Sequence, residues 1–411
     1  MILLQRLTRT FILMALTATG LLGRVALAQS APRPAPSSTA CFAVSFDARV
    51  RDAISGYAEV AGIPGVSFGV VVGDSLVYAG GVGYANKRAR TPATADTPYL
   101  VASVTKLFTA TLAIQLAAEG RLDLDAPIAR YLPDSVRLPL DPAGHGITAR
   151  HLLTHSARLP KNPSNRRNQP VEGPIDPGIW EAYDVPDLYR GLAATKLAGP
   201  LGTTMLYSNY GYGLLGHVVE RVAEQPYEQL LRARLLAPLG MTESGITMSA
   251  AQLERRAAEY WEDDDARVEQ RQHARFGEVA GFIGLTSTVR DLARFVIAHL
   301  GTTADGRRVL SREVVALMAE PQLHVETTAG RRYDMALGWF RRIAADSVAA
   351  TPLLWHTGEI DGHSSGVYLR PQERIGVILL QNLGGETAGR AIEQSAEWLM
   401  RVTREEVSRC R

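Results

Sequence analysis

Apolar residues fill nearly every position from residue 107 to residue 118, and only threonine and glutamine interrupt them. A helix that is apolar on all sides is usually buried, and Gly120 is a natural helix end. The pattern therefore predicts a buried helix that starts at Ser103-Val104-Thr105-Lys106. A serine and a lysine three residues apart lie on one face of such a helix, one turn from each other.

The segments before this helix change from a helical to an extended period. Apolar positions in helical step after Ser45-Phe46-Asp47 predict a first helix, which Pro64 ends. The dense apolar run 65–72, the turn pair Gly73-Asp74 and the run 75–82 predict a β-hairpin. The chain is thus expected to open with a helix and two antiparallel strands.

The middle of the chain, about residues 121–276, has mostly helical patterns separated by loops. Helices are predicted at 151–155 and 210–223, and residues 158–178, rich in Pro, Asn and Gly, predict a long surface loop that is either a lid or a passive excursion. The elements predicted after residue 276 are a helix at 288–299, a strand at 353–355, a hairpin of 365–369 with 375–381, and a last helix at about 388–408.

This order predicts an α/β (α+β) fold with a mostly antiparallel sheet, flanking helices and a helical insertion. We expect one domain over 46–411. Its sheet part comes from about 46–100 and 277–411, and its helical part from about 101–276.

The first 28 residues have the layout of a secretory signal peptide. Arg6 and Arg9 precede the apolar run 11–22, and Ala26-Leu27-Ala28 forms a small-x-small cleavage site. The run is shorter than the about 20 apolar residues that span a bilayer. An uncleaved anchor is the alternative. We expect an exported protein, periplasmic or secreted, without stable membrane insertion after cleavage, and a flexible linker over 29–45.

Composition adds limits on partners and on redox state. The chain has 411 residues and a formal net charge of +2, which gives no argument for nucleic-acid binding. Two cysteines, Cys41 and Cys410, lie after the linker and at the C-terminal end. In an exported protein they can form a disulfide, with two free thiols as the alternative.

Lysine is rare in this chain, because only four of the 44 basic residues are lysines, and Lys106 is one of them. A lysine at the mouth of an apolar helix is desolvated, which lowers its pKa and lets it act as a base. Arginine cannot give up its proton. Ser103 beside such a base is an activated nucleophile, whereas the alternative is a structural lysine whose charge reaches solvent.

Two further motifs stand at predicted element ends: Tyr207-Ser208-Asn209 before the 210–223 helix, and His356-Thr357-Gly358 directly after the 353–355 strand. With Ser103-x-x-Lys106, in this order, they resemble the serine β-lactamase and penicillin-binding protein superfamily. The Tyr-x-Asn form is similar to the class C branch, which also holds esterases and D-amino-acid peptidases. The resemblance covers about residues 46–400 and implies a β-lactamase/transpeptidase-like fold.

The resemblance also implies a role for each motif residue. Ser103 would be the acyl-accepting nucleophile, and Lys106 and Tyr207 would share the general-base and general-acid work in an order that stays open. Asn209 would hydrogen-bond Lys106 and the acyl group. The backbone N–H groups of Ser103 and Glu359 would hold the oxyanion.

His356 departs from the family pattern, since β-lactamases and most penicillin-binding proteins have lysine there. With Thr357 and Gly358 it is expected to line the substrate site, but a histidine at pH 7 is mostly neutral and attracts a carboxylate weakly. Ester or peptide hydrolysis is therefore favoured over strong β-lactamase activity. We also expect the rate ratio of penicillin to ester to rise from pH 8 to 5.5 as the imidazole gains a proton.

A competing motif is excluded. Gly362-His363-Ser364-Ser365-Gly366 matches the nucleophile elbow of α/β-hydrolases, but that elbow needs a following helix and a later catalytic histidine. Here a hairpin follows and His363 is the last histidine. His151 and His155 lack the glutamate of a zinc motif, and we find no motif for a metal or another cofactor.

The leading hypothesis is an exported serine hydrolase that forms an acyl-enzyme with an ester or a D-amino-acid-containing peptide. The alternatives are a class C-type β-lactamase or D,D-carboxypeptidase, and a non-catalytic homologue that binds penicillin or peptide. The expected partner is a small-molecule or peptide acyl substrate, and the sequence sets no oligomeric state. The resemblance further implies adjacent first and last helices, which would let Cys41 and Cys410 meet.

Overall fold

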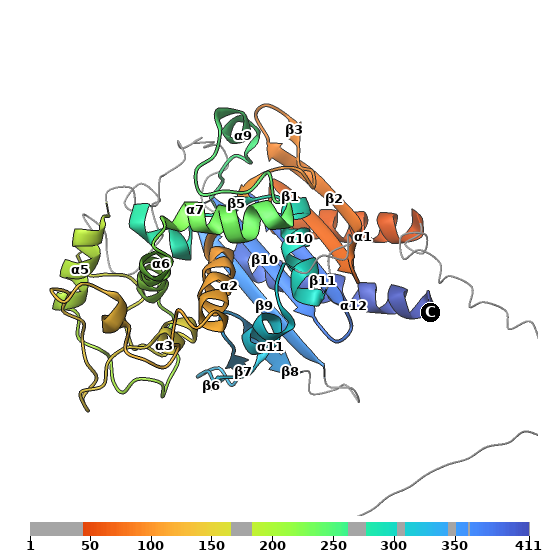
Figure 1. The fold of residues 1–411 in the computed structure, drawn as a ribbon. Coiled ribbons are helices and arrows are strands. Elements are labelled where there is room, and N and C mark those ends of the chain that lie inside the picture. The colour runs from red at the N-terminus through yellow and green to blue at the C-terminus, as the bar shows by residue number, and fades with distance from the viewer. Residues whose placement is uncertain are drawn as a thin grey trace, which may run out of the picture. The chain divides into compact units, whose positions relative to one another are not determined.

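Within the described residues of this computed structural model, nine antiparallel strands form one sheet in the order β3-β2-β1-β11-β10-β9-β8-β7-β6 (Figure 1). The structure describes residues 44–165, 183–261, 277–301, 309–343, 351–360 and 362–410. The strands are β1 Gly65–Val72, β2 Ser75–Asn86, β3 Thr91–Pro92, β6 Leu323–Glu326, β7 Arg332–Met335, β8 Phe340–Ile343, β9 Pro352–Ile360, β10 His363–Arg370 and β11 Ile375–Gln381.

Each face of the sheet has its own hydrophobic core, because successive side chains of a strand point to opposite faces. On β11, Val377 and Leu379 belong to the core under α1 (Val44–Val60) and α12 (Glu386–Arg409). Ile378 and Leu380 belong to the core shared with α2 (Thr105–Ala118), α10 (Val289–Leu300) and α11 (Arg312–Ala319). The strand is buried on both faces, which explains its unbroken apolar run.

Strands β4 (Tyr99–Leu100) and β5 (Thr286–Ser287) pair as a separate two-stranded sheet. The remaining helices come between these two strands in the chain. They are α3 Ala149–Leu153, α5 Val185–Ala194, α6 Asn209–Ala223, α7 Tyr227–Leu231, α8 Ala237–Leu239 and α9 Ala250–Arg255, with short turns of helix η2 Ala102–Val104, η3 Ile128–Tyr131, η4 Arg232–Leu236 and η5 Gly277–Phe282.

The fold confirms the predicted antiparallel sheet with flanking helices. The first hairpin begins and turns where the sequence predicts, and the buried 107–118 helix is present as α2. The predicted strand 353–355 is too short, because β9 continues through Ile360 and pairs with β10 along that length. His356-Thr357-Gly358 therefore lies within a strand and not after it, since backbone pairing continues whatever the side chains are.

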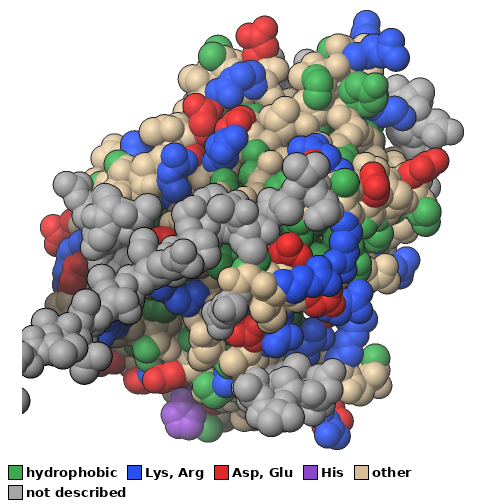
Figure 2. Space-filling model, turned by 90° about the vertical axis from the view of Figure 1, so that its right-hand side faces the viewer, with side chains coloured by type: hydrophobic (Ala, Val, Ile, Leu, Met, Phe, Trp, Pro, Cys, Tyr) green, Lys and Arg blue, Asp and Glu red, His purple; other side chains and the backbone are tan. Residues whose placement is uncertain are grey.

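Charges of both signs are interspersed on the face that Figure 2 presents, at the end of the fold where α12 finishes. Arg49 of α1 pairs with Glu405 of α12 at 3.1 Å. None of the described helices is long and apolar enough to span a membrane. The expected signal peptide (1–28) and Cys41 lie outside the described residues, as do most of the expected linker (29–45) and loop (158–178).

Candidate active site

Ser103 and Lys106 meet at the junction of η2 with α2. Ser103 lies in η2, which runs directly into α2, so the two side chains are one helical turn apart. The Lys106 Nζ is 2.8 Å from the Ser103 Oγ. Ser103 is 9% exposed and Lys106 is fully buried. The pair thus lies at the edge of the core, where one hydroxyl still reaches the surface.

The Lys106 amine has two further partners, and both are pure hydrogen-bond acceptors. It donates to Asn209 Oδ1 at 2.9 Å and to the Phe282 carbonyl at 3.1 Å. Burial lowers the pKa of Lys106 well below its usual range, and the charge of Lys161 lowers it further. The amine is therefore available in its neutral form far below pH 10.

Tyr207 stands two residues before Asn209, the first residue of α6, and its side chain hydrogen-bonds that of Ser103. The Lys106 Nζ lies 4.9 Å from the centre of the Tyr207 ring. Burial raises the pKa of Tyr207 above its usual value, and the hydrogen bond with Ser103 offsets part of that rise. The phenol consequently keeps its proton at neutral pH.

Asn162 fixes the orientation of the Asn209 amide. The Asn209 Nδ2 donates to Asn162 Oδ1 at 3.1 Å, and its backbone N–H donates to the Lys161 carbonyl at 2.8 Å. Both asparagines are 2% exposed. Asn162 was not predicted as a site residue, because it stands in a segment whose sequence predicts a surface loop. A polar residue in such a segment carries no pattern that marks it as buried.

Strand β9 passes so close to the nucleophile that only glycine fits at position 358. A Cβ on Gly358 would lie 2.3 Å from the Val101 carbonyl oxygen and 2.8 Å from the Ser103 backbone nitrogen. Strand β8 pairs with β9 only as far as Trp355. Beyond Trp355 no described strand pairs with that edge of β9.

His356 is buried on β9 and is 1% exposed. Its Nδ1 lies 2.7 Å from the Thr357 carbonyl, which can only accept, so Nδ1 carries the proton and Nε2 is a bare acceptor. Burial and then the charge of Lys106 lower the pKa of His356 to about 3. The expectation that this imidazole gains a proton between pH 8 and 5.5 is therefore wrong. The buried ring has almost no contact with water, which would be needed to stabilise the cation.

His155 lies behind Tyr207, and the two ring centres are 4.3 Å apart. The Ser208 N–H donates to its Nδ1 at 3.1 Å, so Nε2 carries the proton. Burial and then the charge of Lys106 lower the pKa of His155 well below its usual range. His151 instead accepts the Thr148 N–H at 3.2 Å and completes a capping box on α3. Both histidines thus have structural partners.

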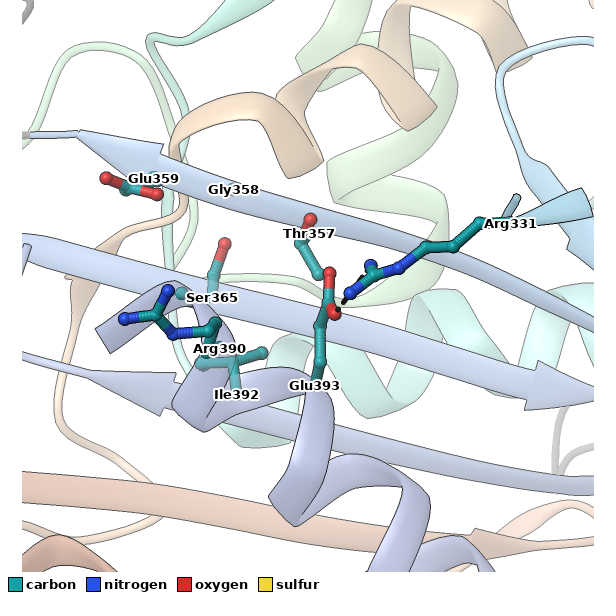
Figure 3. Close-up of a pocket in the computed structure, with 9 residues that line it drawn as sticks. Arg331, Thr357, Gly358, Glu359, Ser365, Arg390, Ile392 and Glu393 are labelled. Atoms are coloured by element: carbon teal, nitrogen blue, oxygen red, sulfur yellow. Dashed lines mark ion pairs between the residues drawn. The ribbon is translucent and has the colours of Figure 1, made fainter. Parts of the chain in front are cut away.

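A cavity of about 360 Å³ adjoins β9 on the side of α12, and Figure 3 shows its walls. Arg331 and Glu393 form an ion pair across it at 3.7 Å. Gly358 and Ser365, which contact the Ser103 turn, belong to its lining. The lining residues are Arg331, Thr357, Gly358, Glu359, Ser365, Gly389, Arg390, Ile392 and Glu393.

Fold and comparisons together define a member of the serine β-lactamase and penicillin-binding protein superfamily, as the motifs predicted. The family model described as Beta-lactamase matches residues 50–399, and the chain belongs to this family.

An uncharacterized protein of Mycobacterium tuberculosis is 33% identical over 274 residues, which cover 61% of this chain and 66% of the relative. The chain thus spans less than two thirds of that relative's length. The crystal structure of a β-lactamase/D-alanine carboxypeptidase from Yersinia pestis has a TM-score of 0.72 at 21% identity and covers 87% of this chain and 98% of its own. A class C β-lactamase from Rhodobacter sphaeroides has a TM-score of 0.69 at 23% identity, with 86% and 99% covered. These two structures share the fold.

Proposed function

We propose that this protein is an exported serine hydrolase that forms a covalent acyl-enzyme at Ser103, with an ester or a D-amino-acid-containing peptide as substrate. The observation that carries the proposal is the 2.8 Å contact of the Ser103 Oγ with the buried amine of Lys106. Export rests on the signal-like sequence of residues 1–28.

Lys106 takes the first proton in this proposal. Its neutral amine donates two hydrogen bonds, which the Asn209 Oδ1 and the Phe282 carbonyl accept because neither oxygen can donate. The lone pair of the Lys106 nitrogen then faces the Ser103 hydroxyl. As the Ser103 Oγ bonds to the substrate carbonyl carbon, its proton passes to the Lys106 Nζ.

Tyr207 acts as the acid when the tetrahedral intermediate then collapses and the bond from the carbonyl carbon to the leaving group breaks. Its phenol proton goes to the departing alcohol or amine, and the Lys106 ammonium returns a proton to the phenolate. Water then attacks the acyl-enzyme by the reverse path, releases the acid and restores Ser103. The backbone N–H groups of Ser103 and Glu359 hold the negative oxygen in both steps.

The charges around the site support a substrate without a free carboxylate. His356 is neutral near pH 7 because its pKa is lowered to about 3. Arg331, Arg390, Glu359 and Glu393 line the same cavity, so the formal charges of these four side chains cancel. The site therefore lacks the fixed positive charge that lysine in place of His356 would supply.

The second candidate is a class C-type β-lactamase or D,D-carboxypeptidase, the activities that the names of the structural neighbours carry. One observation favours it: two guanidinium groups, of Arg331 and Arg390, line the cavity beside Thr357 and offer partners to a carboxylate. The third hypothesis, a non-catalytic homologue, predicts binding of a penicillin without turnover.

Ser103→Ala tests the proposed function. Loss of the nucleophile should lower turnover of a chromogenic ester by roughly 10⁴-fold or more, and the thermal midpoint should hardly change because one hydroxyl at the site mouth is removed. Mass spectrometry after incubation with the ester or a penicillin should show an acyl mass on Ser103 in the wild type alone. Acylation of the variant would contradict the assignment. Wild-type acylation by penicillin without release would favour the binding homologue.

A further inference from the structure

Ser364 and Ser365, the two serines of the stretch that imitates a nucleophile elbow, are neighbours on β10 and so face opposite sides of the sheet. Both are buried, and each hydroxyl donates to a backbone carbonyl. The Ser364 Oγ donates to Leu383 at 2.8 Å. The Ser365 Oγ donates to Val101 at 2.7 Å, and this bond reaches the turn that holds Ser103.

The turn before Ser103 is strained. Ala102 has a φ of +47°, in the left-handed region that residues with a Cβ rarely adopt. Such a conformation persists only where its surroundings hold it. Bonds on both sides of Val101 do so: its N–H donates to the Leu285 carbonyl at 2.9 Å, and its carbonyl accepts the Ser365 hydroxyl and the Val104 N–H.

The bond of Ser365 lies directly beside the proposed oxyanion donor. A Cβ on Gly358 would be 2.6 Å from the Ser365 Oγ and 2.8 Å from the Ser103 backbone nitrogen. These two groups therefore adjoin the same glycine of β9. A change of φ at Ala102 to a negative value would relieve the strain, and it would turn the following peptide, which carries the Ser103 N–H, away from β9.

We propose that Ser365 is a positioning residue: its hydroxyl holds the Val101 carbonyl, keeps Ala102 in its left-handed conformation and so aims the Ser103 N–H at the developing oxyanion. The inference rests on the proposed acyl-enzyme function. It assigns Ser365 no contact with the reacting atoms, since its hydroxyl donates to the backbone.

Ser365→Ala and its matched control Ser364→Ala separate this role from a purely structural one. Each variant loses one buried hydroxyl bonded to a carbonyl, so we expect similar falls in the thermal midpoint. Ser365→Ala should lower kcat for an ester by about 10- to 100-fold with KM within about 3-fold, because small displacements at a reacting centre and weakened oxyanion donors cost rates of that order. Ser364→Ala should keep kcat within about 3-fold.

A second substitution tests the strain itself. Glycine adopts positive φ without the penalty of a Cβ, so Ala102→Gly combined with Ser365→Ala should recover at least about 3-fold of the lost kcat. Ala102→Gly alone should change kcat by less than about 3-fold. A double variant no faster than Ser365→Ala would show that the strained turn does not transmit the effect.

The outcomes distinguish this inference from the proposed function. If Ser103→Ala keeps the activity, the proposed function fails and the inference fails with it. If activity depends on Ser103 but Ser365→Ala and Ser364→Ala have equal kcat, only the positioning role is wrong. Should Ser365→Ala not fold, Ser365→Cys keeps the volume with a weaker donor, and wild-type kcat in that variant would overturn the inference.

Discussion

The Lys106 side chain shows at the residue scale why a lysine and an arginine are not equivalent here. Its amine is buried among an amide oxygen, a carbonyl and a hydroxyl, and its pKa lies well below the usual range. A guanidinium cannot lose its proton and does not fit three partners arranged around one nitrogen.

Lys106→Arg should therefore lose nearly all turnover, about 10³-fold or more, even though the charge is kept. The exposed Lys196→Arg is the control and should behave as wild type. In the wild type, kcat/KM should rise with pH as Lys106 loses its proton, with an apparent pKa well below 10.5. A Lys106→Arg enzyme of near-normal rate would show that Lys106 is a structural cation.

His356→Lys should raise the ratio of kcat/KM for a penicillin to that for an ester by about 5-fold or more. A fixed charge about 4 Å from a carboxylate is worth about 1–4 kcal/mol, and about 1 kcal/mol corresponds to that factor. The control His356→Gln, which stays uncharged, should leave the ratio unchanged.

In the wild type this ratio should be flat from pH 5.5 to 8, because the pKa of His356 is lowered to about 3. A ratio that climbs on acidification would mean that another group titrates at the site. A ratio that His356→Lys does not move would mean that position 356 does not reach the carboxylate.

Helix α10 carries a buried histidine with no part in the proposed chemistry. His299 is 2% exposed, donates from Nδ1 to the Phe295 carbonyl at 3.0 Å, and lies between the rings of Phe295 and Trp339. Burial lowers its pKa to about 4. Below pH 6.5 His299 takes up a proton in the unfolded chain, whereas in the folded protein it stays neutral until the pH falls to about 4. The free energy of unfolding therefore decreases as the pH falls.

We therefore expect the unfolding free energy of wild type to fall between pH 7 and 4.5 by about 2–3 kcal/mol more than that of His299→Gln. Denaturant titrations of both proteins at the two pH values measure the difference. Parallel losses in the two proteins would show that His299 is not a source of acid sensitivity.

Elements with strong local patterns were predictable from the sequence, and those held by pairing alone were not. Strand β1 has the predicted bounds because its apolar run and its turn are adjacent in the chain. Strands β6 and β7 went unpredicted because each has only four residues, too few for the alternation of polar and apolar side chains to mark a strand. The polar end of β9 was not predicted, because its extended conformation depends on backbone pairing with β10 and not on its own side-chain pattern.

The site divides in the same way. The contact of Ser103 with Lys106 could be predicted because it spans one helical turn. Asn209 was expected beside Lys106 only through the family resemblance, and it lies there. The Phe282 carbonyl and Ser365 could not be predicted, because these groups reach the site from 176 and 264 residues away.

At the scale of the whole molecule, the pairing of Cys41 with Cys410 remains a prediction, since Cys41 lies outside the described residues. Helices α1 and α12 lie together on one face, and the ion pair of Arg49 with Glu405 joins them at 3.1 Å. Cys410 stands at the end of α12, so the chain before α1 needs little length to reach it.

The mature protein should therefore contain no titratable thiol under denaturing, non-reducing conditions. Closing so long a loop should stabilise the fold by roughly 2–5 kcal/mol, so reduction should lower the thermal midpoint. The double variant Cys41→Ala/Cys410→Ala should match the reduced wild type. Two thiols in the unreduced protein would refute the pairing.

The order of strands also bears on when the protein becomes active. Strand β1 pairs with β11, and the turn at Ser103 contacts β9 and β10. These N-terminal segments therefore cannot form their native contacts before the C-terminal strands are present. Contacts so distant in sequence form late in folding. A growing chain that ends before β9 thus carries Ser103 and Lys106 but lacks the strand that would complete the proposed oxyanion site. The proposed hydrolase should therefore be inactive until β9 and β10 have paired, and recovery of activity during refolding should report completion of the sheet.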